Sequence, residues 1–315
     1  MKIALDAMGG DFAPDAIVEG AILAANELPV DAQVVLIGDQ TQIDAILHRL
    51  GTAAGPRLLV QHAAEVINMG EHPTKALGQK PDSSIAVGYR MLKSGEVAAF
   101  CSAGNTGAMM VGALFSVKAL PGVKRPPIAG FIPKCTGGTG VIVDVGANAD
   151  CKPEMLEQFA EIGSIYAKYV LNIAEPRVGL LNIGEEEGKG TIDVQETYQL
   201  LKANSAIRFI GNIEGRDIFM DKCDVIVCDG FTGNVVLKMA ESIYDIMVER
   251  GLQDAYFDRY NYEAIGGSPI LGVNGNVVIG HGVSSPLAAC NMVKLGYQMS
   301  AAGVLERFRR VYAVS

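Results

Sequence analysis

Short apolar runs that end in polar, glycine-containing turns recur along this chain of 315 residues. Each run has the composition of a buried strand, and the stretch after each turn has the spacing of a helix. Strands that alternate with helices favour a mainly parallel sheet with helices on both faces. We therefore expect an α/β fold whose polar turns gather at the carboxyl ends of the strands, where such folds bind ligands.

The turn at residues 101–109, CSAGNTGAM, is the strongest candidate for a binding site. It lies between the apolar run Val97–Phe100 and a helical stretch. Glycine permits a sharp turn and a close approach of a ligand, and a helix that begins there directs free N–H groups toward an anion. The predicted anion site consists of Gly104, Asn105, Thr106 and Gly107. The alternative is a glycine-rich connector in which Thr106 caps the helix.

A second turn, Asp229–Asn234 with the sequence DGFTGN, repeats the Thr-Gly pair after the apolar run at 225–228. The two turns lie in different halves of the chain, so we expect one domain over residues 1–315 with two lobes around a cleft. The Pro-rich passage at 121–127 is the best candidate for the junction between the lobes.

The remaining elements follow from the same patterns. Further strands are predicted at 2–6, 33–37, 57–60, 140–145, 178–183, 207–210 and 277–279. Helices are predicted at 14–26, 41–50, 83–93, 154–170, 191–204, 235–250 and 286–310. Residues 64–80 have weak periodicity, which indicates a long loop.

Composition excludes some function classes. The net charge of -9 disfavours nucleic-acid binding, which needs clustered Lys and Arg. The sequence MKIALDAMGGD has no signal-peptide form, and no apolar run approaches the roughly 20 residues of a membrane span. We expect a cytoplasmic protein.

Several known motifs are missing. The sequence contains no G-x-G-x-x-G, and residues 184–191, GEEEGKGT, are one residue short of a P-loop. Three glutamates in that loop would also repel a nucleoside triphosphate. Neither the four His nor the six Cys residues have the spacing of a metal site, so we expect no metal and no cofactor. Cys101 and Cys228 are expected to pack as small apolar groups.

Two lysines in polar turns are candidate anion-binding groups. Lys189 lies in the glycine loop, where it would serve as a cation for a phosphate or an oxyanion. Its alternative is a loop lysine that pairs with Glu185–Glu187. Lys152 stands near Asp150, which would orient it, and its alternative is a plain residue before the helix at Pro153.

Six segments together resemble the bacterial phosphate acyltransferase family of phospholipid synthesis. They are MGGD at 8–11, SAGNTGA at 102–108, DVGANADCKP at 144–153, VGLLNIGEEEGKG at 178–190, FIGNIEGRD at 209–217 and CDGFTGN at 228–234. The resemblance implies transfer of a fatty acyl group from acyl carrier protein to inorganic phosphate. It also implies a homodimer, a fold similar to phosphotransacetylases and isocitrate-type dehydrogenases, and a product that passes to the membrane glycerol-3-phosphate acyltransferase.

The chain departs from the family pattern in two places. Longer members have a basic, apolar helical segment after the helix at 235–250, whereas residues 251–265 here are short and mixed in charge. Many members also have a lysine two residues before the histidine of the HG motif, where this chain has Ile279. No role for that lysine carries over.

The implied reaction needs mainly positioning and stabilisation of an oxyanion. Phosphate attacks the thioester carbonyl, and a thiol with an ordinary pKa of about 8.5 leaves with modest help. The residues from Gly104 to Gly107 would bind phosphate, with Lys189 as the cation. Further groups for substrate or oxyanion are Asn148, Lys152, Asp229, Thr232, Gly233, Asn234 and His281, of which Asp229 would orient one of the others.

Three other functions remain open at this point. A phosphotransacetylase acting on a short acyl-CoA would use the same chemistry. A covalent acyltransferase would use Cys151, which lacks a His nearby in sequence. A non-catalytic carrier of lipid would leave the polar turns without a purpose.

Two surfaces are candidates for docking the acidic carrier protein, which needs a basic patch. One consists of Lys118, Lys124, Arg125 and Lys134, and the other of Arg307, Arg309 and Arg310. We favour the first, with Lys124 and Arg125 at its centre. Residues 249–265 carry more acidic than basic side chains, so we expect at most weak membrane association. The apolar side of the helix at 235–250 is expected in the core or in a dimer interface.

Overall fold

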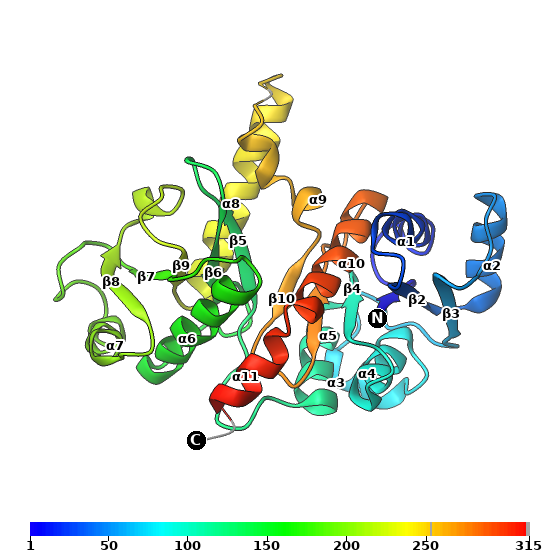
Figure 1. Ribbon diagram of the computed structural model, residues 1–315, viewed down its shortest axis with the longest axis horizontal. Helices are drawn as coiled ribbons and strands as arrows, with labels where there is room; N and C mark the ends of the chain where they lie inside the picture. Colours follow the sequence, from blue (N-terminus) through cyan, green and yellow to red (C-terminus); the bar gives the residue numbers. More distant parts are fainter. Residues whose placement is uncertain (253, 313–315) are drawn as a thin grey trace. The chain divides into compact units, whose positions relative to one another are not determined.

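The computed structural model describes residues 1–252 and 254–312, which form two compact units with a sheet each (Figure 1). Unit 1 consists of Met1–Ala119 and Tyr262–Ala301. Unit 2 consists of Leu120–Asn261 and the chain from Ala302 onward. The first crossing between the units falls directly before the Pro-rich passage at 121–127.

The sheet of unit 1 has the strand order β10-β11-β4-β1-β2-β3 within the described residues. Its strands are β1 (Lys2–Asp6), β2 (Gln33–Gly38), β3 (Leu58–His62), β4 (Ala99–Ser102), β10 (Ser268–Ile270) and β11 (Asn276–Ile279). All pairs are parallel except β10 with β11. The carboxyl ends of β1, β4 and β11 therefore lie at one edge, and their following turns meet there.

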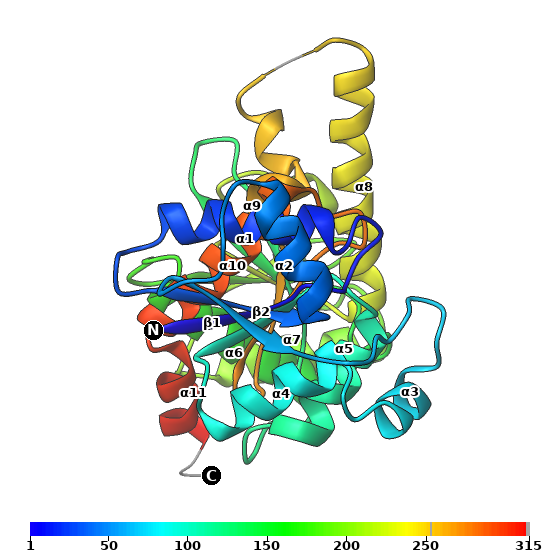
Figure 2. The ribbon, with the colours of Figure 1, turned by 90° about the vertical axis from the view of Figure 1, so that its right-hand side faces the viewer.

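Helices cover both faces of this sheet. They are α1 (Asp15–Glu27), α2 (Gln40–Arg49), α3 (Pro73–Gln79), α4 (Ser84–Ser94), α5 (Thr106–Gly112), α9 (Tyr262–Ile265) and α10 (Pro286–Ala301), and α5 continues as a π-helical turn over Ala113–Val117. Figure 2 shows α1 and α10 over one face and α4 under the other. Gly20 of α1 permits close packing, since a Cβ there would lie 2.5 Å from Ala289 Cβ of α10.

The sheet of unit 2 has the order β5-β6-β9-β7-β8. Its strands are β5 (Ala129–Pro133), β6 (Thr139–Val143), β7 (Arg177–Leu181), β8 (Arg208–Ile213) and β9 (Val225–Val227), and only the edge pair β5–β6 is antiparallel among the described strands. Its helices are α6 (Pro153–Tyr169), α7 (Ile192–Ala203), α8 (Gly230–Glu249) and α11 (Val304–Tyr312), with 3₁₀ turns at Gly215–Asp217 and Phe257–Tyr260.

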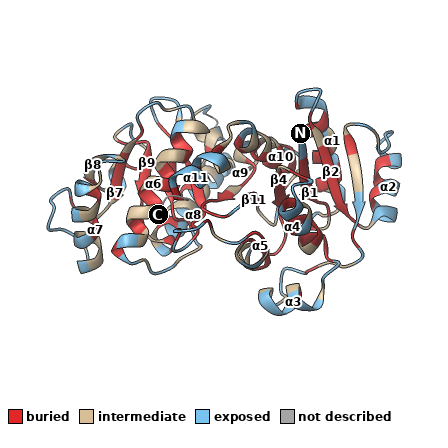
Figure 3. Cartoon of the chain, turned by 60° about the horizontal axis from the view of Figure 1, so that its bottom comes forward, coloured by how far each residue is buried: buried red, intermediate tan, exposed pale blue. Residues whose placement is uncertain are grey.

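The helices α6 and α8 cover opposite faces of this second sheet. Gly163 of α6 lies against Val143, whereas Leu237 of α8 lies near Gly130, which also faces Ile142. Neighbouring residues of a strand point to opposite faces, so the two helices must be on different sides. In each unit the buried residues follow the strands (Figure 3), as expected for parallel sheets covered on both faces.

The structure confirms the α/β class with mainly parallel sheets, and it corrects several boundaries. The predicted loop at 64–80 contains the helix α3. The helix predicted at 286–310 is two helices, because Gly303 adopts a left-handed φ of +63° between them. The strands β5 and β10 were not predicted, because each contains a proline, which disfavours a strand in a sequence pattern, and each pairs antiparallel at an edge.

The helix α8 begins at Gly230, five residues before the predicted start, and its apolar side is not in the core. Val235, Met239 and Ile246 are each about half exposed, at 52%, 52% and 53%. The prediction of a core position is therefore wrong for this side within the single chain. Of the two places that were predicted, the dimer interface remains.

Candidate active site

Polar turns in unit 1 meet at the carboxyl ends of β1, β4 and β11. The N–H of Gly280 donates to the carbonyl of Ser102 at 2.9 Å, and the N–H of Asp11 donates to the carbonyl of Gly282 at 2.6 Å. A Cβ on Gly9 would lie 2.6 Å from the backbone nitrogen of Gly104, so only glycine fits between these turns. The MGGD, SAGNTGA and HG motifs thus form one surface.

Asp6, the last residue of β1, stabilises this surface through hydrogen bonds to its turns. Its side chain is 1% exposed and accepts hydrogen bonds from Ser102 Oγ at 2.6 Å and from the N–H of Met8 at 3.0 Å. Burial raises the pKa of the Asp6 carboxyl, and these hydrogen bonds only partly oppose the shift. Ser102 Oγ in turn accepts the N–H of Gly104 at 3.0 Å. Consequently that N–H is already used within the turn.

Asn105, not Thr106, caps α5. Its Oδ1 accepts the N–H of Ala108 at 2.9 Å, so the predicted cap at Thr106 is wrong. Its Nδ2 donates to three carbonyls at 3.0–3.1 Å, those of Asn68, Met69 and Glu71. The side chain of Asn105 therefore fixes the loop at 68–71 over the turn and has no free N–H. Thr106 is exposed and Gly107 is half-buried, which leaves these two positions accessible to an anion.

His281 lies at the same edge of unit 1. Its ring centroid is 5.1 Å from that of Tyr262, and its carbonyl accepts the N–H and Oγ of Ser284 at 3.0 and 2.5 Å. These backbone contacts fix the HG turn, and the ring itself is partly exposed.

Unit 2 has a comparable buried carboxylate at the end of β6. Asp144 accepts the N–H groups of Ile128 at 2.9 Å, Ala147 at 3.2 Å and Asn148 at 2.7 Å. Burial raises the pKa of Asp144, and these bonds to its carboxylate act in the opposite direction. The side chain therefore fixes the turn at 145–148.

Asn148 joins this turn to its neighbours. Its Nδ2 donates to Asp144 Oδ2 at 3.0 Å and to the carbonyl of Pro126 at 3.1 Å, and its own carbonyl accepts the N–H of Gly230 at 2.7 Å. An amide has two N–H donors, so Asn148 has none left for an oxyanion in this arrangement. Its contacts are those of a positioning residue.

The start of α8 packs directly on the Asp144 turn. A Cβ on Gly233 would lie 1.9 Å from the carbonyl oxygen of Asp144, so this contact requires glycine. Asp229 caps the helix by accepting the N–H and Oγ1 of Thr232 at 2.7 and 2.9 Å. Asp229 thus orients Thr232. Asn234 is exposed beside Gly146.

Lys189 and Lys152 are both exposed at this edge of unit 2. Within residues 1–252 and 254–312, neither has an ion pair. Glu187 pairs with Lys202 at 2.7 Å and Glu185 pairs with Lys222 at 2.6 Å. Among the described residues, Lys189 forms no ion pair with Glu185, Glu186 or Glu187, and Lys152 forms none with Asp150, so these two predicted pairings are wrong.

A cavity of about 350 Å³ opens between the starts of α7 and α8. Asp150, Asp193 and Asp229 line it, together with Cys151, and no Lys or Arg is among the described residues that line it. Such a cavity repels phosphate. Burial and the neighbouring Asp144 raise the pKa of the Cys151 thiol to about 12, which disfavours the thiolate that a covalent route needs.

Glu185, Glu214 and Asp217 bring their carboxylates within 4.8 Å of one another. The ammonium of Lys222 lies 2.6 Å from Glu185 and 2.9 Å from Asp217. The ammonium of Lys222 therefore balances part of the negative charge of these three carboxylates.

One residue of the carrier-docking patch that we favoured, Lys134, is buried and already paired. Lys134 is 6% exposed and its Nζ pairs with Asp224 and, at 2.9 Å, with Asp221. It therefore supports the structure of unit 2 and is not available to a partner. Lys124 and Arg125 are exposed and stay candidates.

Comparison with known proteins decides the family. A family model described as a fatty acid synthesis protein matches residues 1–255. Proteins named phosphate acyltransferase from Syntrophomonas wolfei and Heliobacterium modesticaldum are 44% and 45% identical, over 97% and 98% of this chain and 97% and 95% of their own. The chain belongs to the phosphate acyltransferase family. This confirms the resemblance drawn from the six motifs.

Solved structures confirm the fold of this phosphate acyltransferase family member. A phosphotransacetylase from Streptococcus pyogenes covers 97% of the chain, and 94% of its own, with a TM-score of 0.67 and 19% identity. A branched-chain phosphotransacylase from Enterococcus faecalis covers 95%, and 99% of its own, with a TM-score of 0.63 and 13% identity. No helix in the described part of the chain is long and apolar enough to cross a membrane.

Three groups that build these turns were not predicted from the sequence: Asp6, Asp144 and the Ser102 hydroxyl. Each is a polar residue at or next to the end of an apolar run. That position is the signal that would have found them, since a polar residue there is buried under the following turn.

Proposed function

We propose that this protein transfers a fatty acyl group from acyl carrier protein to inorganic phosphate and releases an acyl phosphate for phospholipid synthesis. The proposal rests on one observation above all: relatives named phosphate acyltransferase match almost the entire chain at 43–45% identity. The glycine turns that carry the family motifs also form connected polar surfaces at the sheet edge of each unit.

The proposed reaction balances with phosphate as the nucleophile. A phosphate oxygen attacks the thioester carbon, the C–S bond of the tetrahedral intermediate breaks, and the carrier thiolate leaves and takes up a proton. We propose that Thr106 and Gly107 bind phosphate, because the N–H of Gly104 donates to Ser102 Oγ and the side-chain amide of Asn105 donates to carbonyls of the loop at 68–71. Lys189 and Lys152 are the proposed cations, since neither has an ion-pair partner in the described chain.

The remaining roles follow the same reasoning. Thr232, oriented by Asp229 and followed by the buried Gly233, is proposed as a substrate contact. Asn234 and His281 remain the proposed donors to the oxyanion, whereas Asn148 is proposed to position the turn. The raised pKa of Cys151 favours direct attack by phosphate over an acyl-cysteine.

We also propose a homodimer in which α8 contacts a second copy of this chain. The exposed residues Val235, Met239 and Ile246 form an apolar stripe on a helix of 20 residues. A stripe of this kind marks an interface in a soluble protein. Lys238 and Glu241, which pair at 2.7 Å, lie beside it and offer both charges to an equivalent helix.

Sedimentation velocity tests the dimer. The double variant Met239→Glu/Ile246→Glu should sediment as a folded monomer, while Asp245→Asn, exposed on the same helix, should remain a dimer. A wild-type protein that is monomeric at micromolar concentration would contradict this interface. A variant that binds vesicles less than the wild type, without a change in mass, would assign the stripe to a membrane.

The proposed location is the cytoplasm, with at most weak membrane association and with the membrane glycerol-3-phosphate acyltransferase as acceptor of the product. Arg259 is one of the two basic residues in the segment at 249–265, and its guanidinium is already used within the protein. It donates to the carbonyls of Lys134, at 3.2 Å, and Gly138, which supports the proposal that membrane association is weak. This contact holds the segment after α8 against the β5–β6 hairpin.

Substrate comparison tests the function. The purified protein is incubated with phosphate and either a long-chain acyl carrier protein or acetyl-CoA, and acyl phosphate is trapped with hydroxylamine. We expect the hydroxamate from the carrier substrate. Product from acetyl-CoA alone would instead make the protein a short-chain phosphotransacetylase.

A further inference from the structure

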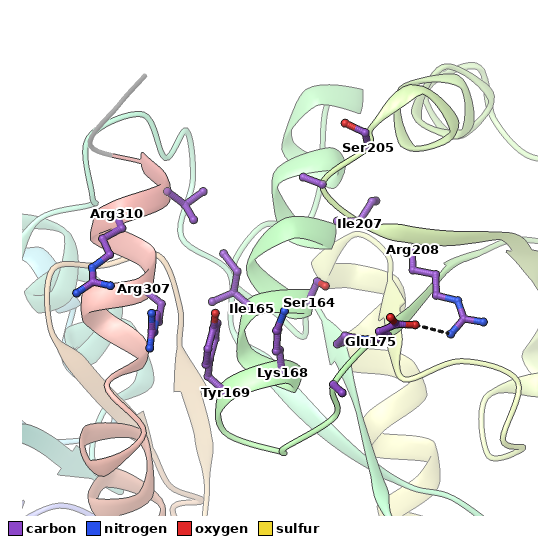
Figure 4. Close-up of a pocket in the computed structure, with 14 residues that line it drawn as sticks. Ser164, Ile165, Lys168, Tyr169, Glu175, Ser205, Ile207, Arg208, Arg307 and Arg310 are labelled. Atoms are coloured by element: carbon purple, nitrogen blue, oxygen red, sulfur yellow. Dashed lines mark ion pairs between the residues drawn. The ribbon is translucent and has the colours of Figure 1, made fainter.

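Unit 2 contains a second cavity, far from its polar turns. It has a volume of about 650 Å³, which is within the range of small-molecule sites, roughly 300–1,000 Å³. It lies between the end of α6, the start of β8 and the outer side of α11 (Figure 4). The helix α6 begins at Pro153, next to Lys152 at the polar edge, and ends at Tyr169 at this cavity, and its 17 residues span about 25 Å. The cavity is therefore separate from the proposed active site.

The charge of this cavity is opposite to that of the whole chain. Four basic side chains and one carboxylate line it: Lys168, Arg208, Arg307, Arg310 and Glu175. Arg208 and Glu175 pair at 3.7 Å. The other three cations have no carboxylate partner within residues 1–252 and 254–312. An uncompensated positive site in a chain of net charge -9 favours an anionic ligand.

The ring of Tyr169 contacts two of these three cations. The guanidinium of Arg307 lies 4.7 Å from the ring centroid of Tyr169, and Lys168 Nζ lies 5.9 Å from the same ring. Figure 4 shows Arg307 beside this ring. The helix α11 is fixed by its buried residues Val304, Phe308 and Tyr312, and Tyr312 Oη donates to Glu161 of α6 at 3.1 Å.

The lining also contains apolar side chains beside the cations, those of Ile165, Pro176, Ile207 and Val311. A free phosphate ion would fill only a small part of such a space. A ligand with an apolar body and a terminal phosphate would contact both kinds of surface.

From this geometry we propose that the cavity between α6, β8 and α11 is a second anion site, which binds a phosphorylated small molecule with an apolar body. Arg307, Arg310 and Lys168 contact the phosphate, and the apolar side chains contact the body. The proposal does not depend on the acyl transfer proposed above, because it concerns a cavity at the other end of α6.

Isothermal titration calorimetry of the full chain without Mg²⁺ tests this site. The two probes are ATP, which represents nucleotides, and octyl phosphate, which represents lipid-like phosphates. At low salt we expect at least one probe to bind at submillimolar concentration and to weaken as salt is added. Arg310→Gln should weaken that binding about tenfold or more, because it removes a charge-assisted hydrogen bond.

Two variants make the test specific. Arg309→Gln removes the same charge one residue away, from a side chain that pairs with Glu306 and does not line the cavity, so its affinity should equal that of the wild type. Arg310→Lys should restore much of the binding. Absence of binding by both probes would overturn the proposal, as would equal binding by Arg310→Gln and the wild type. A loss of thermal stability in Arg310→Gln without any probe binding would show that the arginine only stabilises the end of α11.

Discussion

Replacing Gly233 by alanine tests the contact on which the unit 2 turns depend. The added Cβ would lie 1.9 Å from the carbonyl oxygen of Asp144 and 2.9 Å from Cys228 Sγ. The first of these is a backbone atom, so it cannot rotate away, and the start of α8 must move outward. Overpacking of this kind costs about 1–3 kcal/mol, which corresponds to a fall in Tm of roughly 3–10 °C for a unit of this size.

Gly188→Ala is the matched control for this change. Gly188 lies in the loop before Lys189, its φ is not left-handed, and a Cβ there would meet nothing within 4 Å. Thermal unfolding followed by circular dichroism should give a Tm near that of the wild type for Gly188→Ala and a clearly lower Tm for Gly233→Ala. Turnover of acyl phosphate should fall in Gly233→Ala as well, because Thr232 moves with the helix. If both variants unfold at the same temperature, the packing of α8 on the Asp144 turn is not what fixes this edge.

Four further changes test individual residues. Lys189→Met should lower turnover about 100-fold or more with the fold intact, and near-normal turnover at saturating phosphate would make Lys189 a plain surface lysine. Cys151→Ala should leave turnover nearly unchanged, whereas complete loss in a folded protein would revive the covalent route. Ion pairs hold the pKa of Asp224 below its usual value despite burial, so its contribution to stability is present above pH ~4 and is lost as pH falls. The difference in urea midpoint between the wild type and Asp224→Asn should therefore shrink from pH 5 toward pH 2, and a constant difference would contradict the ion-pair explanation. Charge reversal at Lys124 and Arg125 should raise KM for the carrier substrate and leave KM for phosphate unchanged, and equal effects on both would argue against docking there.

The sequence was sufficient to predict the alternation of strands and helices and the positions of the polar turns, because both depend on local patterns. Asp6, for example, ends an apolar run, and Gly9 and Gly10 follow it after two intervening residues, so the first turn can be placed without any tertiary information. The edge strand β5 was missed because Gly130 and Pro133 interrupt its apolar run. The break at Gly303 was missed because the apolar spacing on either side continues through it.

Side-chain partners were much harder to predict, since they come from distant parts of the chain. Asn105 reads as a polar turn residue, yet its amide binds carbonyls at residues 68–71. Lys134 reads as a surface charge, yet Asp224 neutralises it in the interior. In both cases the contact joins segments more than 30 residues apart, and no local pattern reports such a pairing.

Tracing phosphate oxygen through a single turnover is the most direct test of the central claim. The enzyme is mixed with a long-chain acyl carrier protein and phosphate labelled with oxygen-18, and the product is analysed by mass spectrometry. Direct attack by phosphate predicts one acyl phosphate for each carrier thiol released, with every labelled oxygen retained. Thiol release that does not require phosphate, with unlabelled fatty acid as the product, would contradict the assignment of phosphate as the acceptor.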